Sequence, residues 1–122
     1  MTVTSIHADA IPDPRLTEID AETLDCWMME GAAVLVDVRE ASEFALEHIE
    51  GSALFPLSGY DLSEFPANWG LPVVLVCAIG VRSAKVGNAL LRHGHKQAIH
   101  LKGGLEAWKQ AGFETARAAQ AA

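Results

Sequence analysis

Short apolar runs alternate along this chain with stretches in which apolar side chains recur every three or four positions. The runs predict five strands, at residues 17–19, 34–38, 53–57, 72–77 and 98–101. The run at 34–38 is apolar almost throughout, which is typical of a strand covered on both faces. Strands that alternate with helices predict an α/β fold in which helices pack around a parallel sheet.

The intervening stretches predict helices with recognisable ends. Asp20 can cap the helix that follows it, because a short side-chain oxygen accepts a free backbone N–H there, and Gly31 supplies a left-handed stop. Pro66 interrupts another helical pattern, since proline has no backbone N–H to donate. The predicted helices cover residues 21–30, 40–46, 62–69, 83–93 and 105–111.

A chain of 122 residues, half of them apolar, has the size of one domain. We expect a flexible arm over residues 1–14, the folded domain over 15–114 and an alanine-rich tail over 115–122. The arm has neither the basic start nor the apolar run of a signal peptide. The longest apolar stretch, residues 73–79, is far shorter than the ~20 residues that span a bilayer. These features predict a cytoplasmic protein that does not enter membranes.

The charge and the cysteine content limit the binding partners, disulfides and cofactors to be expected. Nine lysines and arginines against sixteen aspartates and glutamates give a formal charge of -7, which argues against nucleic acid and anionic membranes as partners. The two cysteines, Cys26 and Cys77, are too few for a disulfide scaffold. Cys26 is expected in the core, with a redox partnership to Cys77 as the alternative. The five histidines lack metal-ligand spacing, so we expect neither a metal nor another cofactor.

The candidate chemistry lies at Cys77, where an apolar strand ends and a helix begins about six residues later. Ligands of open α/β sheets bind at such strand ends. Gly80 allows the connecting loop to turn tightly, so its backbone N–H groups converge and form an anion site. The same field favours thiolate over thiol at the cysteine, and Arg82 adds a positive charge at the rim. The alternative is an inert cysteine that packs as a small hydrophobic residue.

Four segments in a fixed order resemble the rhodanese-like domain family. The six residues from Cys77 to Arg82 are similar to the family's active-site loop, with glycine three positions after the cysteine. The other segments are residues 37–44, residues 48–57 with their His-Ile-Glu-Gly-Ser start, and the Leu-Lys-Gly-Gly-Leu-Glu-Ala-Trp sequence of residues 101–108. Together they extend over residues 16–113, nearly the whole chain.

The resemblance implies an α/β domain with a mostly parallel five-stranded sheet flanked by helices, and a catalytic cysteine that carries sulfur as a persulfide. That role falls on Cys77. The residues implied to cradle the substrate are Ala78, Ile79, Gly80, Val81 and Arg82. Asp37, Arg39 and Ser83 are expected to support the loop, with Arg39 pairing with Glu43 across one helical turn. His48 lies in a family segment that is mainly a turn, so we interpret it as structural.

Loop length separates the two chemistries of the related families. Rhodanese-like phosphatases resemble this fold but have a loop one residue longer, whereas here only four residues separate Cys77 from Arg82. The resemblance therefore favours transfer of sulfane sulfur from a small donor such as thiosulfate to cyanide or to a thiol, either a small thiol or a thioredoxin-like protein. Two other functions stay open: a regulatory or partner-binding module of the same fold, and an oxyanion reductase or phosphatase.

Overall fold

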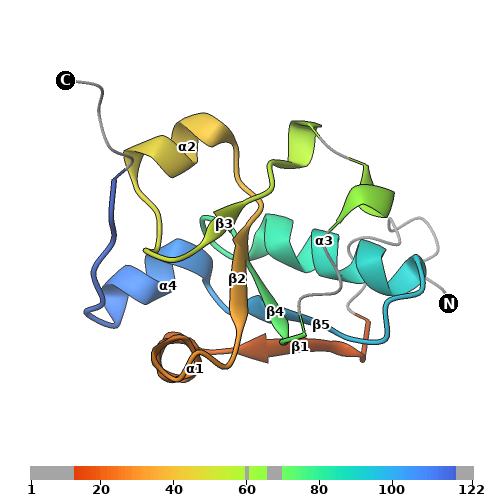
Figure 1. Cartoon of the computed structure of the whole chain (residues 1–122), viewed down its shortest axis with the longest axis horizontal. Helices are drawn as coiled ribbons and strands as arrows, with labels where there is room; N and C mark the ends of the chain where they lie inside the picture. Colours follow the sequence, from red (N-terminus) through yellow and green to blue (C-terminus); the bar gives the residue numbers. More distant parts are fainter. Residues whose placement is uncertain (1–12, 60, 66–69, 118–122) are drawn as a thin grey trace, which may run out of the picture.

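The computed structural model describes residues 13–59, 61–65 and 70–117, which form one twisted sheet with helices on both faces (Figure 1). The sheet has five strands in the order β1-β5-β4-β2-β3, and each neighbouring pair is parallel. The strands are β1 (Leu16–Ile19), β2 (Val34–Asp37), β3 (Ala53–Leu54), β4 (Val73–Val76) and β5 (Ala98–Leu101). The predicted α/β fold with a parallel five-stranded sheet is confirmed.

The helices follow the strands in turn. They are α1 (Ala21–Met29), α2 (Ala41–Leu46), α3 (Val81–Arg92) and α4 (Gly104–Gln110), with the 3-10 turns η2 (Leu57–Gly59) and η3 (Leu62–Glu64) between β3 and β4. Asp20 caps α1 as predicted, because its carboxylate accepts the N–H of Thr23 at 2.8 Å. Gly31 follows α1 with a φ of +66°, which is the predicted left-handed stop.

Two predicted elements differ from the structure. The strand expected at residues 53–57 ends at Leu54, because Pro56 cannot donate to a neighbouring strand and the chain then enters η2. The helix expected at 62–69 is wrong in its described part, since only the turn Leu62–Glu64 forms and Phe65 is already extended. The rest of that expectation, residues 66–69, lies outside the described residues.

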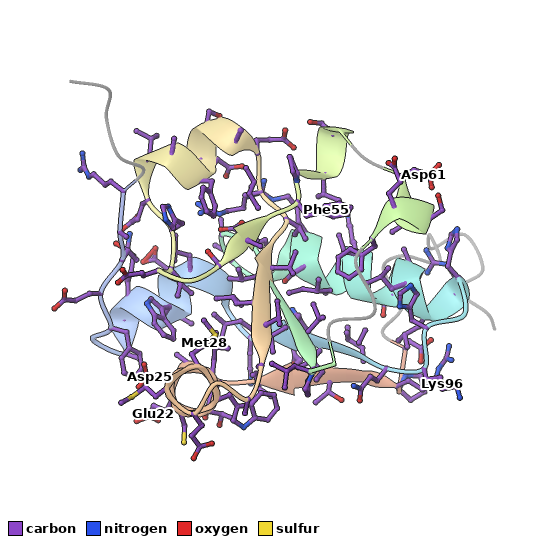
Figure 2. All side chains as sticks on the ribbon, viewed as in Figure 1. Glu22, Asp25, Met28, Phe55, Asp61 and Lys96 are labelled. Atoms are coloured by element: carbon purple, nitrogen blue, oxygen red, sulfur yellow. The ribbon has the colours of Figure 1, made fainter. Side chains whose placement is uncertain are left out.

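The core is divided by the sheet into two apolar layers. On one face α1 and α4 pack Leu24, Leu105 and Trp108 against the strands, and on the other α3 packs Val86 and Leu90. Figure 2 shows Met28 of α1 directed toward the interior, where it packs against the core, and Glu22 directed away from it. The central strand β4 is therefore covered on both faces, which explains its unbroken apolar sequence.

The described residues near the C-terminus contact the folded domain. His48 and Ala116 pair their backbones in an isolated antiparallel bridge, and Thr115 Oγ1 donates to Glu47 at 2.7 Å. The first residues of the expected tail are therefore held against the segment that follows α2. Residues 1–12 of the expected arm and 118–122 of the tail lie outside the described residues. No helix within the described ranges combines the length and the apolar character that a membrane crossing requires.

Candidate active site

The sulfur of Cys77 lies beside two backbone N–H groups at the carboxyl end of the central strand. The residue is 0% exposed, and its Sγ accepts backbone N–H groups from Gly80 at 3.1 Å and Ser83 at 3.2 Å. The hydroxyl Oγ of Ser83 lies 3.4 Å from the same sulfur. The two backbone N–H groups stabilise negative charge on the sulfur, and the start of α3 adds the field of a helix N-terminus.

The loop reaches this geometry because the chain reverses at Gly80. Its φ is +96°, a left-handed conformation that costs side chains with a Cβ atom, and α3 starts at the next residue. The helix therefore begins at Val81, two residues earlier than predicted, and brings the Ser83 N–H over the sulfur. A Cβ atom at position 80 would also lie 3.1 Å from the backbone nitrogen of Gly103.

The start of α4 holds the loop from behind through main-chain hydrogen bonds. The N–H of Leu105 donates to the carbonyl of Cys77 at 2.8 Å, and the N–H of Glu106 donates to that of Ala78 at 3.0 Å. Gly104 makes this approach possible, because a Cβ atom there would lie 2.7 Å from the carbonyl oxygen of Ala78. With these carbonyls directed toward α4, the loop can turn its amides toward the sulfur.

The outer surface of the loop is apolar. Ile79 is 63% exposed and Val81 is 53% exposed, whereas Cys77 and Gly80 beneath them are buried. Ala78 is half-buried. The loop therefore presents two branched aliphatic side chains to solvent.

Arg82 is paired with a carboxylate at the edge of the loop. Its Nη1 and Nη2 donate to Glu43 Oε1 and Oε2 at 2.8 and 3.0 Å. The guanidinium lowers the pKa of Glu43 to about 2, and Glu43 in turn raises the pKa of Arg82. The expected pairing of Arg39 with Glu43 is wrong, because the carboxylate of α2 lies against the guanidinium of α3 instead.

Arg39 instead forms a buried ion pair with Asp37 at the end of β2. Its Nε and Nη2 donate to the Asp37 carboxylate at 3.0 and 2.8 Å, and its Nη2 also donates to the carbonyl of Glu47 at 2.7 Å. Both side chains are almost fully buried. The pair ties the end of β2 to the end of α2, beside the strand that carries Cys77.

The site includes two further residues, His100 and Glu18, that the sequence pattern did not indicate. His100, on β5, lies with its Nδ1 2.9 Å from Ser83 Oγ and its Nε2 3.0 Å from Glu18 Oε2 on β1. Burial lowers the pKa of His100, and the charge of Glu18 partly opposes this effect. The available signal was a lone histidine inside a strand that is otherwise apolar; a search for metal-ligand spacing does not detect it.

Cys26 does not belong to this site. The expectation that it packs in the core is wrong, because its side chain projects to solvent from α1 while Leu24 takes the buried position. Both cysteines are free. In the part of the chain that the structure describes, no three histidine, cysteine, aspartate or glutamate side chains are grouped to hold a metal ion.

The fold and the loop together define a small α/β domain with a buried, amide-bound thiol at the end of its central strand. This chain belongs to the rhodanese-like domain family, whose profile matches residues 20–111. It is 33% identical over 86 residues to the thiosulfate sulfurtransferase GlpE of Haemophilus influenzae, covering 69% of this chain and 80% of that protein. It is 41% identical over 99 residues to the uncharacterized protein slr1261 of Synechocystis, covering 81% of this chain.

Several of these relatives are longer proteins. The chain spans 55% of slr1261, and it matches 26% of the probable adenylyltransferase/sulfurtransferase MoeZ of Mycobacterium tuberculosis at 35% identity, over 82% of its own length. Among solved structures, a rhodanese-like domain protein of Staphylococcus aureus superposes with a TM-score of 0.63 at 28% identity, over 84% of this chain and 99% of that one. A thiosulfate sulfurtransferase of Pseudomonas aeruginosa gives 0.71 at 27% identity, over 86% of this chain and 20% of the other.

Proposed function

We propose that this domain is a sulfurtransferase that takes sulfane sulfur from a donor such as thiosulfate as a Cys77 persulfide and passes it to a nucleophilic acceptor. The observation that carries the proposal is the pair of backbone N–H groups, from Gly80 and Ser83, that point at the buried sulfur. The relatives named as thiosulfate sulfurtransferases support the same chemistry.

In the first half-reaction the Cys77 thiolate attacks the outer sulfur of the donor. A new S–S bond forms with the electron pair of the thiolate, and the donor's own S–S bond breaks, so that sulfite leaves with the bonding pair. The product is a persulfide whose outer sulfur carries negative charge. Loop amides fixed before the reaction stabilise that charge without reorganisation, as in an oxyanion hole.

In the second half-reaction an acceptor nucleophile attacks the outer sulfur. Cyanide would leave as thiocyanate, and a thiolate would leave as a persulfide, while the bonding electrons return to Cys77 as thiolate. The exposed side chains of Ile79 and Val81 suit an acceptor that brings an apolar surface, such as a thioredoxin-like protein, better than they suit a highly charged one. A small thiol needs no such contact.

In this proposal Arg82 does not serve mainly to bind the anionic donor. Its guanidinium already binds Glu43 through two hydrogen bonds, so an anionic donor would compete with that carboxylate. We assign Arg82 chiefly to fixing the start of α3 against α2. Toward the reacting sulfur, Ala78, Ile79, Gly80 and Val81 act through their main chain, while the side chains of Ile79 and Val81 face the acceptor. Asp37 and Arg39 brace the neighbouring strand end.

The test is to incubate the purified protein with thiosulfate and to measure its mass and its production of thiocyanate from cyanide. We expect an adduct of about 32 Da on Cys77, turnover with ping-pong kinetics, and loss of both in Cys77→Ser. The matched control is Cys26→Ser, which removes the exposed thiol and should keep both. Full activity in Cys77→Ser would refute the proposal. A phosphate ester assayed in parallel tests the phosphatase alternative, for which we expect no hydrolysis.

A further inference from the structure

An unbroken line of polar contacts leaves the Cys77 sulfur and crosses the sheet to its edge strand. The separations are 3.4 Å from Cys77 Sγ to Ser83 Oγ, 2.9 Å from Ser83 Oγ to His100 Nδ1, and 3.0 Å from His100 Nε2 to Glu18 Oε2. The line thus passes from the end of β4 through α3 and β5 to β1, which lie side by side in Figure 1.

The hydrogens along this line have one consistent direction. The Glu18 carboxylate can only accept, so the neutral imidazole of His100 carries its hydrogen on Nε2 and leaves Nδ1 as an acceptor. The hydroxyl of Ser83 then donates to Nδ1 at 2.9 Å in preference to the carbonyl of Gly80, which lies farther away at 3.3 Å, and the Ser83 oxygen can accept the S–H of Cys77. Every donor points away from the sulfur, so a proton can move outward by one short step at each contact.

Burial makes such a path useful. Cys77 and Ser83 are fully enclosed and His100 is 2% exposed, so a base in solution has no direct access to the thiol proton from this side. Glu18 is the member of the line that meets solvent, with 52% of its side chain exposed. The strand register places Glu18 opposite His100, which fixes the last contact by main-chain pairing of β1 with β5.

We infer that Ser83, His100 and Glu18 form a proton relay that deprotonates Cys77 for sulfur transfer and returns the proton when the thiol is restored. The inference rests on the proposed sulfurtransferase function. The thiol proton passes to Ser83 Oγ as the Ser83 hydroxyl proton passes to His100 Nδ1, and the Nε2 proton then passes to Glu18 and to water. The electron pair stays on Cys77 sulfur and forms the new S–S bond. Ser83 contacts the reacting atom, whereas His100 and Glu18 are positioning residues that act through it.

The charges around His100 determine what a pH profile should show. Glu18 on β1 is the charged group that faces it, while α3 contributes the neutral hydroxyl of Ser83 and the end of β4 contributes the thiol of Cys77. Protonated His100 cannot accept another proton, so the rate should fall on the acid side as the ring becomes charged. Because Glu18 raises the pKa of His100, removing its charge should move this acid limb to lower pH.

The experiment measures the rate of Cys77 persulfide formation from thiosulfate by rapid quenching and mass spectrometry, from about pH 5 to about pH 9. All variants carry Cys26→Ser so that the mass reports on Cys77 alone. We expect Ser83→Ala and His100→Gln to slow loading by about a hundredfold and to lose the acid limb. Glu18→Gln keeps an acceptor for His100 Nε2 and lies at the surface, so it should fold, load more slowly and shift the limb to lower pH.

Loading of Ser83→Ala, His100→Gln and Glu18→Gln at the parent rate with an unchanged pH profile would overturn the relay and leave the sulfurtransferase proposal intact. A merely structural role would lower the rate without moving the acid limb, and would also overturn it. If the parent protein loads no sulfur, the proposed function fails. The relay is then judged by alkylation of Cys77 with iodoacetamide, which needs a thiolate but no sulfur donor: a roughly tenfold slower reaction in His100→Gln supports it, and an equal rate overturns it.

Discussion

Arg82 and Glu43 meet through two hydrogen bonds, 2.8 and 3.0 Å long, that join the start of α3 to α2. The two residues are 39 positions apart in the sequence, so the pair joins two distant segments of the chain. Each side chain is 35% exposed, which limits the energy of the interaction because water screens the charges.

The pair predicts a specific dependence of stability on acid. Arg82 lowers the pKa of Glu43 from 4.5 to about 2, so the stabilisation is fully present above about pH 4.5 and is lost as the pH falls through about 2. Glu43→Gln should remove this contribution. Urea unfolding of both proteins between these pH values should show a difference of at most about 1 kcal/mol that shrinks toward low pH. A difference that grows as the pH falls would contradict the assignment.

The buried pair of Asp37 and Arg39 should matter far more for stability. Arg39→Ala leaves the Asp37 carboxylate without its partner in a site that water does not reach, and we expect a loss of about 3–5 kcal/mol in the free energy of unfolding. The double variant Asp37→Ala with Arg39→Leu removes both charges and should lose less than the single variant. Unfolding in guanidinium chloride measures the stability of the parent protein, the single variant and the double variant. Equal losses in the two variants would refute this interpretation of the pair.

Gly104 should be required both for folding and for the geometry of the sulfur site. A Cβ atom in Gly104→Ala would lie 2.7 Å from the carbonyl oxygen of Ala78, and would push the loop off the start of α4. Gly31→Ala is a matched control, because Gly31 has a similar φ of +66° against +62° and nothing within 4 Å of the added carbon. We expect the control to lose about 1–2 kcal/mol, and Gly104→Ala to lose several kcal/mol together with persulfide loading. Equal losses would show that the contact with the loop is unimportant.

Ile79 and Val81 should affect the choice of acceptor and not stability. Both are exposed, so Ile79→Ser and Val81→Ser should change the free energy of unfolding by no more than about 0.5 kcal/mol. If a thioredoxin-like acceptor docks on these side chains, its KM should rise in the variants while thiocyanate formation from cyanide keeps its rate. Steady-state assays with both acceptors decide this, and a parallel fall in both rates would argue against an acceptor contact.

The fold could be predicted from the sequence because its strands have distinctive local signals. The runs of valine, leucine and isoleucine at β2, β4 and β5 fit strands buried on both faces, and Asp20 caps α1 as its chemistry requires. The failures are local as well. The apolar pattern of residues 53–57 predicts a strand that is too long, because Pro56 ends it. The start of α3 depends on the φ of Gly80, which the spacing of apolar residues does not determine.

The site could be predicted only in part, because its main contacts join residues far apart in the chain. Arg39 and Glu43 have helical spacing, yet each binds a different partner once β2, α2 and α3 are packed together. The contacts of His100 with Ser83 and Glu18 depend on the pairing of β5 with the edge strand, 82 positions from Glu18. The exposure of Cys26 could not be predicted, because its apolar neighbours on α1 do not decide which side of the helix faces the sheet.

The loop is fastened to α4 through main-chain atoms on both sides of the contact, from Leu105 and Glu106 to the carbonyls of Cys77 and Ala78. Side-chain replacements on the outer surface of the loop therefore leave these bonds in place. The outer side chains of the loop can therefore be exchanged without moving the amides that surround the Cys77 sulfur, so what the loop contacts and how the sulfur is held depend on different atoms.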